Sequence, residues 1–495
     1  MKRFVSVLLS ALLLASGLTA CSDAGENNTD AAETSDIAAE SAEEAGAVEP
    51  EVSYIDTLGE KNFDGADYVV IVTLQGNGLL HPATTEITGE AINDALFQRD
   101  RSLEDRYSVV IQYPEYADSP DTAKTVVNSV LAGDAIGDVY IDALSDGANY
   151  MGYAFQQSAL YNLADVPYLQ LDQEWWSSLM YDKLRCNGKM FFTSGDMACY
   201  SFAAPSCTFM NLQVADNNAI DADAVYSLVY EGKWTLDEMI ARTQGLHNDL
   251  NGDGVFTPEA DSYGVVNATI SLTCEELLVG AGVEMSGIDE NGSLVVDLNN
   301  EKVLNTIEKV KQCYCEVSSS DNTNALLKDC FCGDRTLFCV HFVESAINNY
   351  REMESDFAIL PMPKFDEEQD SYMSYINPHT HSFIAMPLIL EDVEKTGFIT
   401  EVMEYMTVES VRPAIYDITL KGKTARNPDT QAMLDIIFNT TYTEFNAIIN
   451  FGGSIDLLQQ AVFADADFAS GYAKNAKVVT KTAEKIMQLF ADSEG

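Results

Sequence analysis

The chain has 495 residues and a formal net charge of −50, from 78 acidic and 28 basic side chains. A surface this acidic repels nucleic acid and anionic lipid, so we expect no DNA or RNA partner and no polyanionic ligand. The length exceeds what one hydrophobic core usually serves, so the folded part should form two domains.

The first twenty residues have the pattern of an export signal. Two basic residues precede a short, almost entirely apolar stretch at positions 4–18. That stretch is shorter than the roughly 20 apolar residues of a membrane-spanning helix. Leu18-Thr-Ala-Cys21 then resembles the lipobox of bacterial lipoproteins. We therefore predict a signal peptide at 1–20 and a diacylglycerol on the thiol of Cys21. The alternative is an ordinary secretory signal that happens to end beside a cysteine.

The segment after Cys21 is acidic and poor in core-forming residues. Ser22 to Glu51 contains no Lys, no Arg and no aromatic residue. Such a composition cannot bury enough apolar area to offset chain entropy. We expect residues 21–65 to be the lipidated cysteine and a disordered linker, with the folded body starting near Ala66. The protein would be extracytoplasmic, anchored by lipid to the outer face of the cell membrane.

Nine further cysteines are scattered through the chain. An odd number in a chain this long does not indicate a disulfide framework, and the spacings are not those of a usual zinc site. We expect them to be small buried hydrophobic residues.

Short apolar runs alternate with helical patterns in the body. Strands are predicted at Tyr68–Thr73, Tyr107–Gln112 and Asp138–Asp142, separated by helices at Ile92–Arg106 and Thr122–Ala132. This β-α-β-α-β order predicts an α/β fold with a mostly parallel sheet covered by helices on both faces. Further helices are predicted from Trp234, around Val303–Val310, around Phe398–Met406 and at Val479–Phe490.

The order of elements resembles the extracellular solute-binding proteins of ABC importers, family 1, the group that contains maltose-binding protein. The similarity covers the body from about Ala66 to the C-terminus and is to clostridial members. The segments that carry it are Gly89–Tyr107, Trp175-Trp176 with Asn187–Phe192, Lys233–Glu238, Phe331–Val340 with Asp356–Lys364, and Ser374–Pro378.

The resemblance implies a two-lobed fold of the periplasmic-binding-protein type II class. Each lobe would be a mixed β-sheet flanked by helices, with a hinge between the lobes and the ligand in the cleft. One lobe would comprise 66–198 with 376–425, and the other 199–370 with 430–495. The implied function is a monomeric, non-catalytic lipoprotein that captures a carbohydrate, expected to be an oligosaccharide, and delivers it to the transmembrane subunits of an ABC permease.

Candidate ligand-binding residues follow from the chemistry of sugars. Polar groups match the hydroxyls, aromatic faces pack on the C–H surfaces, and ligands meet the carboxyl ends of strands in open α/β sheets. Each candidate has a structural alternative, as a turn or cap residue, a core indole, or a histidine that satisfies backbone groups or binds metal. The candidates are Gln75, Asn77, Ser145, Asp146, Trp175, Trp176, His341, Glu344, His379 and His381, together with Asp196 and Tyr200, which the resemblance places at the first crossover.

The segment Asp249–Asp261 repeats the oxygen spacing of an EF-hand-type calcium loop. Side-chain oxygens stand at positions 1, 3 and 5, glycine at 6 and a backbone carbonyl at 7. Position 12 is Ala260, so the usual bidentate glutamate is missing. A structural Ca²⁺ is the one cofactor predicted, and the alternative is a turn with capping carboxylates. The predicted ligands are Asp249, Asn251, Asp253, Val255 and Asp261.

Two other functions compete with transport. One is a lipid-anchored carbohydrate-active enzyme with two carboxylates across the cleft. The other is a surface receptor or adhesin that uses the same fold without transport. The sequence contains no nucleophile elbow, HExxH, phosphate loop or Ser-Lys pattern, so we expect no catalysis.

Overall fold

In the computed structural model, the folded part of the chain begins at Tyr54. Within the described ranges, no helix has the length and apolarity needed to cross a membrane. The predicted signal peptide, Cys21 and residues 22–52 lie outside these ranges. The described residues are 53–73, 82–116, 119–144, 150–173, 175–198, 205–267, 274–314, 326–379, 381–421 and 429–492.

The first sheet has the strand order β12-β4-β1-β2, with β3 also beside β1. β1 pairs in parallel with β2, β3 and β4, whereas β12 returns from late in the chain and pairs antiparallel to β4. The predicted β-α-β-α-β order and the mostly parallel sheet are confirmed. The elements are β1 (Ala66–Thr73), α2 (Ala91–Tyr107), β2 (Val109–Gln112), β3 (Glu115–Tyr116), α3 (Ser119–Ala132), β4 (Val139–Ala143), α4 (Met151–Gln156), α5 (Ser178–Leu184) and β12 (Ser382–Ala385).

Two boundaries differ from the sequence predictions. Tyr107 was expected in a strand but ends α2, because its ring continues the buried helix face and packs 5.0 Å from the Phe398 ring. Ser108 then adopts φ 53 and ends the helix. The folded unit also starts earlier than Ala66. Helix α1 (Tyr54–Thr57) buries Ile55, so the predicted linker is too long at its C-terminal end.

The second sheet is mixed, with the order β10-β5-β9-β6. β9 runs parallel to β6 and antiparallel to β5. Every residue in the four strands of this sheet is buried. Thr235 caps α8, because its hydroxyl accepts a hydrogen bond from the Glu238 N–H, which confirms the predicted helix start. The elements are β5 (Ser206–Asn211), α6 (Leu212–Asn217), α7 (Ala222–Tyr230), α8 (Leu236–Thr243), β6 (Tyr263–Asn267), α9 (Glu275–Gly280), α10 (Glu301–Cys313), β9 (Thr336–Phe342), α12 (Ser345–Asn348) and β10 (Phe357–Leu360).

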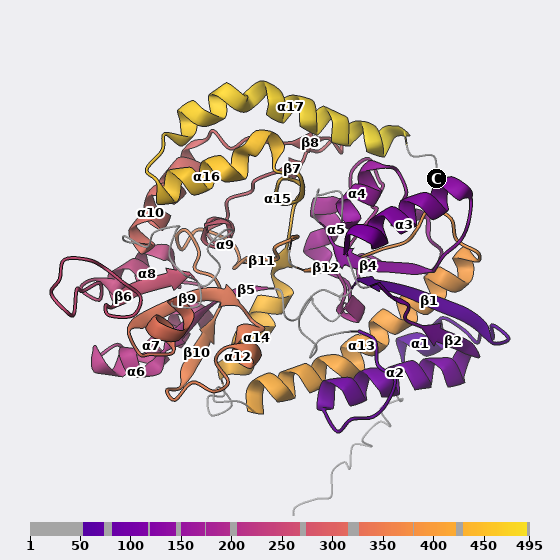
Figure 1. Cartoon of the computed structure of the whole chain (residues 1–495), viewed down its shortest axis with the longest axis horizontal. Coiled ribbons are helices and arrows are strands. Elements are labelled where there is room, and N and C mark those ends of the chain that lie inside the picture. Colours follow the sequence, from indigo (N-terminus) through magenta and orange to yellow (C-terminus); the bar gives the residue numbers. More distant parts are fainter. Residues whose placement is uncertain are drawn as a thin grey trace, which may run out of the picture. The chain divides into compact units, whose positions relative to one another are not determined.

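Helices from the last quarter of the chain pack on elements of both sheet layers. α13 (Val393–Lys421) lies along α2, whereas α14 (Asp429–Asn439) packs on β10 (Figure 1). Phe490 lies in the last turn of α17 (Phe468–Asp492), and its ring lies 5.5 Å from that of Phe155 and 5.6 Å from that of Phe445. The remaining elements are β7 (Gly287–Ile288), β8 (Leu294–Val295), β11 (Ser374–Tyr375), β13 (Thr441–Tyr442), α15 (Phe445–Ile449), α16 (Ser454–Phe463), the short 3₁₀ helices η1 (Leu163–Asp165), η2 (Asp196–Ala198) and η5 (Phe451–Gly453), and the π-helix η3 (Leu326–Phe331).

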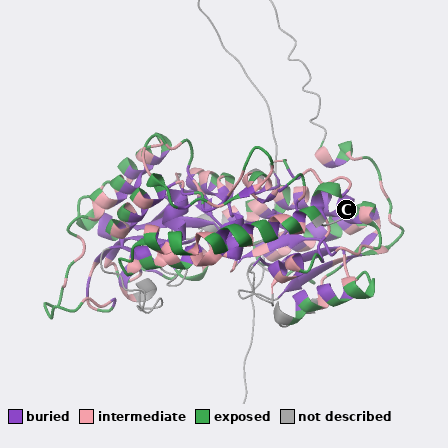
Figure 2. Cartoon of the chain, turned by 90° about the horizontal axis from the view of Figure 1, so that it is seen from above, coloured by how far each residue is buried: buried purple, intermediate pink, exposed green. Residues whose placement is uncertain are grey.

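Burial follows this layering. Figure 2 shows the strands buried and the covering helices exposed along their outer faces. None of the seven cysteines in the described ranges forms a disulfide, and six of them are buried. The expected role of the cysteines as buried hydrophobic residues is confirmed for these six.

Candidate functional site

Three segments meet where the chain passes between the two sheets. The N–H of Ile376 donates to the carbonyl of Tyr442 at 2.9 Å, and the N–H of Leu144 donates to the carbonyl of Pro378 at 2.8 Å. The carboxyl end of β4 therefore touches the segment that leads into β12. The Phe342 ring, at the end of β9, lies 4.8 Å from the His381 ring. We call this place the crossover region, and define it as residues 341–346, 374–379, 381 and 440–447.

His341 lies at the end of β9 and is 6% exposed. Its Nδ1 accepts a hydrogen bond from the Phe342 N–H at 2.7 Å and lies 2.5 Å from the Ser345 hydroxyl. Burial lowers the pKa of His341 to about 3, so the ring is neutral at physiological pH. The predicted ligand residue is thus held by its own strand and the following turn.

His379 and His381 flank the same region. His381 Nδ1 lies 2.8 Å from the Asn377 carbonyl oxygen, and burial lowers its pKa to about 4. His379 Nε2 lies 3.1 Å from the Ala447 carbonyl oxygen. Both rings therefore contact backbone groups. Among the described residues, no three His, Cys, Asp or Glu side chains are arranged to hold a metal ion.

Several buried polar atoms of the crossover region lack a hydrogen-bond partner among the described residues. Glu344 Oε2 is one, and burial raises the pKa of this carboxyl to about 7. Asn377 Nδ2, the Tyr442 hydroxyl, Thr443 Oγ1 and Asn446 Nδ2 are the others. Leaving such a group unpaired costs about 1–3 kcal/mol, so partnerless buried atoms require an explanation. A ligand with several hydroxyl groups supplies both the donors and the acceptors that they lack.

Asp196 is held by α13 at the first crossover. Its carboxylate accepts a hydrogen bond from Arg412 Nε at 2.9 Å, and the Met197 N–H donates to Glu404 at 3.0 Å. The Asp196 N–H also donates to Glu404. Gly195 leaves room for the Glu404 carboxylate, because a Cβ at position 195 would lie 2.7 Å from Glu404 Oε2. The carboxylate of Asp196 thus has an ionic partner, and its contact with ligand stays a prediction.

Trp175 and Trp176 are buried, at 8% and 3% exposure. Their indole N–H groups donate to Glu401 of α13 at 2.8 and 2.9 Å. The Tyr54 hydroxyl and the Gln170 N–H donate to the same carboxylate at 2.9 and 3.1 Å. This placement inside the core does not support the predicted role of the indoles as aromatic platforms.

The remaining ligand candidates lie outside the described residues. Gln75 and Asn77 follow β1, Ser145 and Asp146 follow β4, and Tyr200 follows η2. Both β1 and β4 run with their carboxyl ends on the same edge of the first sheet. The role of these five residues stays a prediction.

The loop at 249–261 is closed by its own hydrogen bonds. The Asp249 carboxylate accepts from the Gly252 and Gly254 N–H groups at 2.6 and 2.8 Å. Asp261 is fully buried and accepts from the Leu250 and Thr257 N–H groups, which lower its pKa. These contacts fit the alternative of a turn with capping carboxylates, and both Asp261 oxygens are already used. The calcium site stays a prediction.

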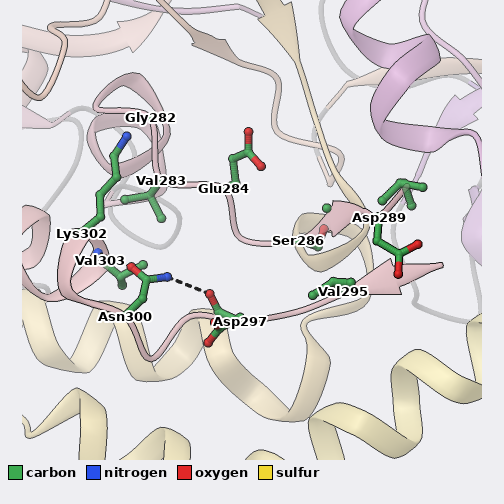
Figure 3. A pocket seen from close by; sticks show the side chains of 12 residues that line it. Gly282, Val283, Glu284, Ser286, Asp289, Val295, Asp297, Asn300, Lys302 and Val303 are labelled. Carbon is green, nitrogen blue, oxygen red and sulfur yellow. Dashed lines mark hydrogen bonds between the residues drawn. The ribbon is translucent and has the colours of Figure 1, made fainter. Parts of the chain in front are cut away.

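A pocket of about 530 Å³ lies beside the crossover region, between the segment that leads into β7 and the start of α10. In Figure 3, Lys302 and Asn300 stand at one end and Asp289 at the other. Ser286 of this pocket donates its N–H to Glu444 at 2.7 Å, and burial raises the pKa of Glu444 to about 8. Residues 282–303 carry no motif, so the sequence does not indicate this pocket.

The fold is similar to that of solved sugar-binding proteins. No protein-family model matches the chain, and no curated protein matches it in sequence. The cyclic α-maltosyl-1,6-maltose binding protein of Arthrobacter globiformis aligns with a TM-score of 0.56 at 11% identity, over 85% of this chain and 99% of that chain. The galacto-N-biose-/lacto-N-biose I-binding protein of a Bifidobacterium longum ABC transporter gives 0.53 at 12% identity, over 86% and 99%.

A third match is the maltose-binding periplasmic protein of Listeria monocytogenes, in complex with maltose. It has a TM-score of 0.50 at 14% identity, over 87% of this chain and 100% of that chain. At such identities the likeness shows the fold. The chain therefore has the α/β, type II periplasmic-binding-protein fold, with mixed sheets flanked by helices.

Proposed function

We propose that this chain is the substrate-binding component of an ABC importer, and that it captures an oligosaccharide at the crossover region without chemical turnover. Support comes from the fold, since the similar structures are binding proteins named for oligosaccharide or disaccharide ligands. The observation that carries the proposal is the set of partnerless buried polar atoms between the sheets. Sugar hydroxyls would pair with the carboxyl of Glu344 and the amides of Asn377 and Asn446.

The route to the membrane is the second half of the proposal. Export and diacylglycerol on Cys21 would keep the protein at the outer face of the cell membrane, next to its permease. Mass spectrometry of the membrane fraction should find the lipid on Cys21. Cys21→Ser should release the protein from that fraction. A soluble protein that starts at any other residue would contradict the anchor and leave sugar binding unaffected.

The binding proposal is tested by calorimetry with maltose to maltopentaose, cellobiose to cellopentaose and lacto-N-biose. We expect one or more of these sugars to bind and to raise the melting temperature, since a ligand of the native state stabilises it. Chromatography of the same mixture should recover the sugar unchanged. Released product would replace the proposal by the enzyme alternative.

Two variants locate the site. Glu344→Ala and Asn377→Ala should each weaken sugar binding about tenfold, because each removes a polar partner of a buried hydroxyl. Glu354→Ala is the matched control, because Glu354 is exposed and lies outside the crossover region. Unchanged affinity in both variants, with the control also unchanged, would place the ligand elsewhere.

A further inference from the structure

A second pocket of about 530 Å³ lies at the outer corner of the first sheet. Segment 83–88 forms one wall, the first turns of α2 form another, and Tyr113 lies directly after the end of β2. Its volume falls within the about 300–1,000 Å³ of small-molecule pockets. We call it the rim pocket.

The rim pocket and the crossover region share one edge of the first sheet. The parallel strands β4, β1 and β2 all end at this edge, and β4 ends beside Pro378 of the crossover region. In the strand order β12-β4-β1-β2, the rim pocket stands at the far strand. Three strand spacings separate β2 from β12, which is about 14 Å. A single sugar ring cannot reach both places.

The wall of the rim pocket is fixed in position by α2. The Thr84 hydroxyl donates to Asn93 Oδ1 at 2.7 Å, and Asn93 Nδ2 donates to the Glu86 carbonyl at 2.7 Å. Asp94 accepts from the Thr88 N–H at 2.9 Å, and this backbone hydrogen bond lowers its pKa. A wall that is already ordered lowers the entropy cost of binding.

The floor of the rim pocket is held by a buried network. The Tyr113 hydroxyl donates to Asp100 Oδ2 at 2.9 Å and accepts from Arg99 at 3.0 Å. Arg99 and Asp100 are 1% and 2% exposed and bind each other through Arg99 Nε at 2.8 Å. The ring of Tyr113 is therefore oriented by its hydroxyl, and Phe97 supplies a second aromatic ring to the same pocket.

The chemistry of the lining fits a neutral polyhydroxylated ring. Arg101 lies 5.5 Å above the Phe97 ring and pairs with Glu104, while Glu86 and Thr85 are exposed. Hydroxyl, carboxylate and guanidinium groups beside aromatic rings match sugar hydroxyls and C–H faces. The presence of both charges disfavours a strongly anionic and a strongly cationic ligand alike.

We propose that the rim pocket is a distal subsite that receives a terminal ring of an oligosaccharide whose other end lies in the crossover region. This inference rests on the proposed function and narrows its ligand to sugar chains longer than a disaccharide. The affinity of the wild-type protein should therefore rise with chain length beyond the disaccharide.

The test compares the chain-length dependence of binding in matched variants. Calorimetry with maltose to maltopentaose and cellobiose to cellopentaose is run on the wild type, Phe97→Ala, Glu86→Ala and Ile87→Ala. Phe97→Ala should weaken binding of the longest bound sugar about three- to tenfold, with the disaccharide unchanged. Glu86→Ala should act in the same direction. Ile87 is 58% exposed in the same segment and outside the pocket lining, so Ile87→Ala should change nothing.

Each outcome decides between the two proposals. If Phe97→Ala weakens all lengths equally, or none, the distal subsite is wrong and sugar binding stands. If the wild type binds neither these series nor lacto-N-biose, both proposals fail. Should Phe97→Ala not fold, Tyr113→Phe keeps the ring but frees it from Asp100. Tyr113→Phe should then show the same loss, confined to long sugars.

Discussion

The Glu344 carboxyl of the crossover region has surroundings opposite to those of the buried carboxylates of α13. Glu444, also in the crossover region, resembles the α13 carboxylates, because it accepts the N–H groups of Met285 and Ser286. On α13, Glu401 accepts four hydrogen bonds and Glu404 accepts two backbone N–H groups. In the crossover region, Glu344 Oε2 has no partner among the described residues. A buried carboxylate is stable only where donors replace its water. The fully paired carboxylates therefore hold the fold together, whereas the unpaired one is free to meet a ligand.

The largest effect should come from Glu401. Glu401→Ala leaves the indole N–H groups of Trp175 and Trp176, and two further donors, without an acceptor. We expect a loss of about 3–5 kcal/mol in the free energy of unfolding, measured by urea denaturation. Glu409→Ala, an exposed site on the same helix, should stay within about 0.5 kcal/mol of the wild type. Equal effects at the two sites would contradict a structural role for Glu401.

The second prediction concerns the space that Gly195 leaves for Glu404. A Cβ there would lie 2.7–2.8 Å from three atoms of that carboxylate, so the helix or the crossover must shift. We expect Gly195→Ala to lower the free energy of unfolding by about 2 kcal/mol. Gly287→Ala is the control, because its nearest atom lies 3.8 Å away. A Gly195→Ala variant as stable as this control would show that the contact is loose.

The third prediction concerns how the free energy of unfolding depends on pH through the unpaired carboxyl of Glu344. The pKa of Glu344 is raised by burial from 4.5 to about 7, so between these values the folded protein keeps a proton that the unfolded chain has released. Stability is therefore lost as pH rises through this window, by about 3 kcal/mol for this one group. Glu344→Gln lacks that loss, so it should gain stability relative to wild type between pH 4.5 and pH 8. A difference that does not vary with pH would mean that the carboxyl is solvated.

The smallest effect is expected at the loop 249–261, whose carboxylates are paired yet mostly exposed. If calcium binds there, a chelator should lower the melting temperature by a few degrees, and Asp249→Ala should abolish that difference. If the loop is only a capped turn, Asp249→Ala should destabilise by about 1 kcal/mol with or without chelator. Identical melting curves with and without chelator in the wild type would overturn the calcium prediction.

The sequence predicted the first half of the fold well because its signals are local. Strands such as Tyr68–Thr73 are continuous apolar runs, and helices such as Ile92–Arg106 repeat at the helical period. The boundary at Tyr107 was wrong because a buried aromatic residue suits both a strand and the end of an apolar helix face. The start of the folded unit at Tyr54 was not predicted, because Tyr54 is held by a hydrogen bond to Glu401, which lies far away in the sequence.

The candidate site was harder to predict than the fold. His341 and His381 do come together, since the end of β9 meets the segment that leads into β12. The position of the Trp175 side chain could not be predicted from the sequence. An indole that stacks on a ligand and an indole that donates to a buried carboxylate have the same local sequence. Whether a polar side chain is paired depends on three-dimensional neighbours. Composition and spacing do not contain that information.

The pairing of β4 with β12 also constrains how the chain folds in time. Asp142 lies opposite Phe383 in the register of these strands, so the first sheet gains its last strand only after most of the chain is available. Contacts so distant in sequence slow folding, because the loop must close before the pairing stabilises anything. A chain emerging N-terminus first therefore exposes an incomplete sheet edge at β4, which is where a folding helper would act.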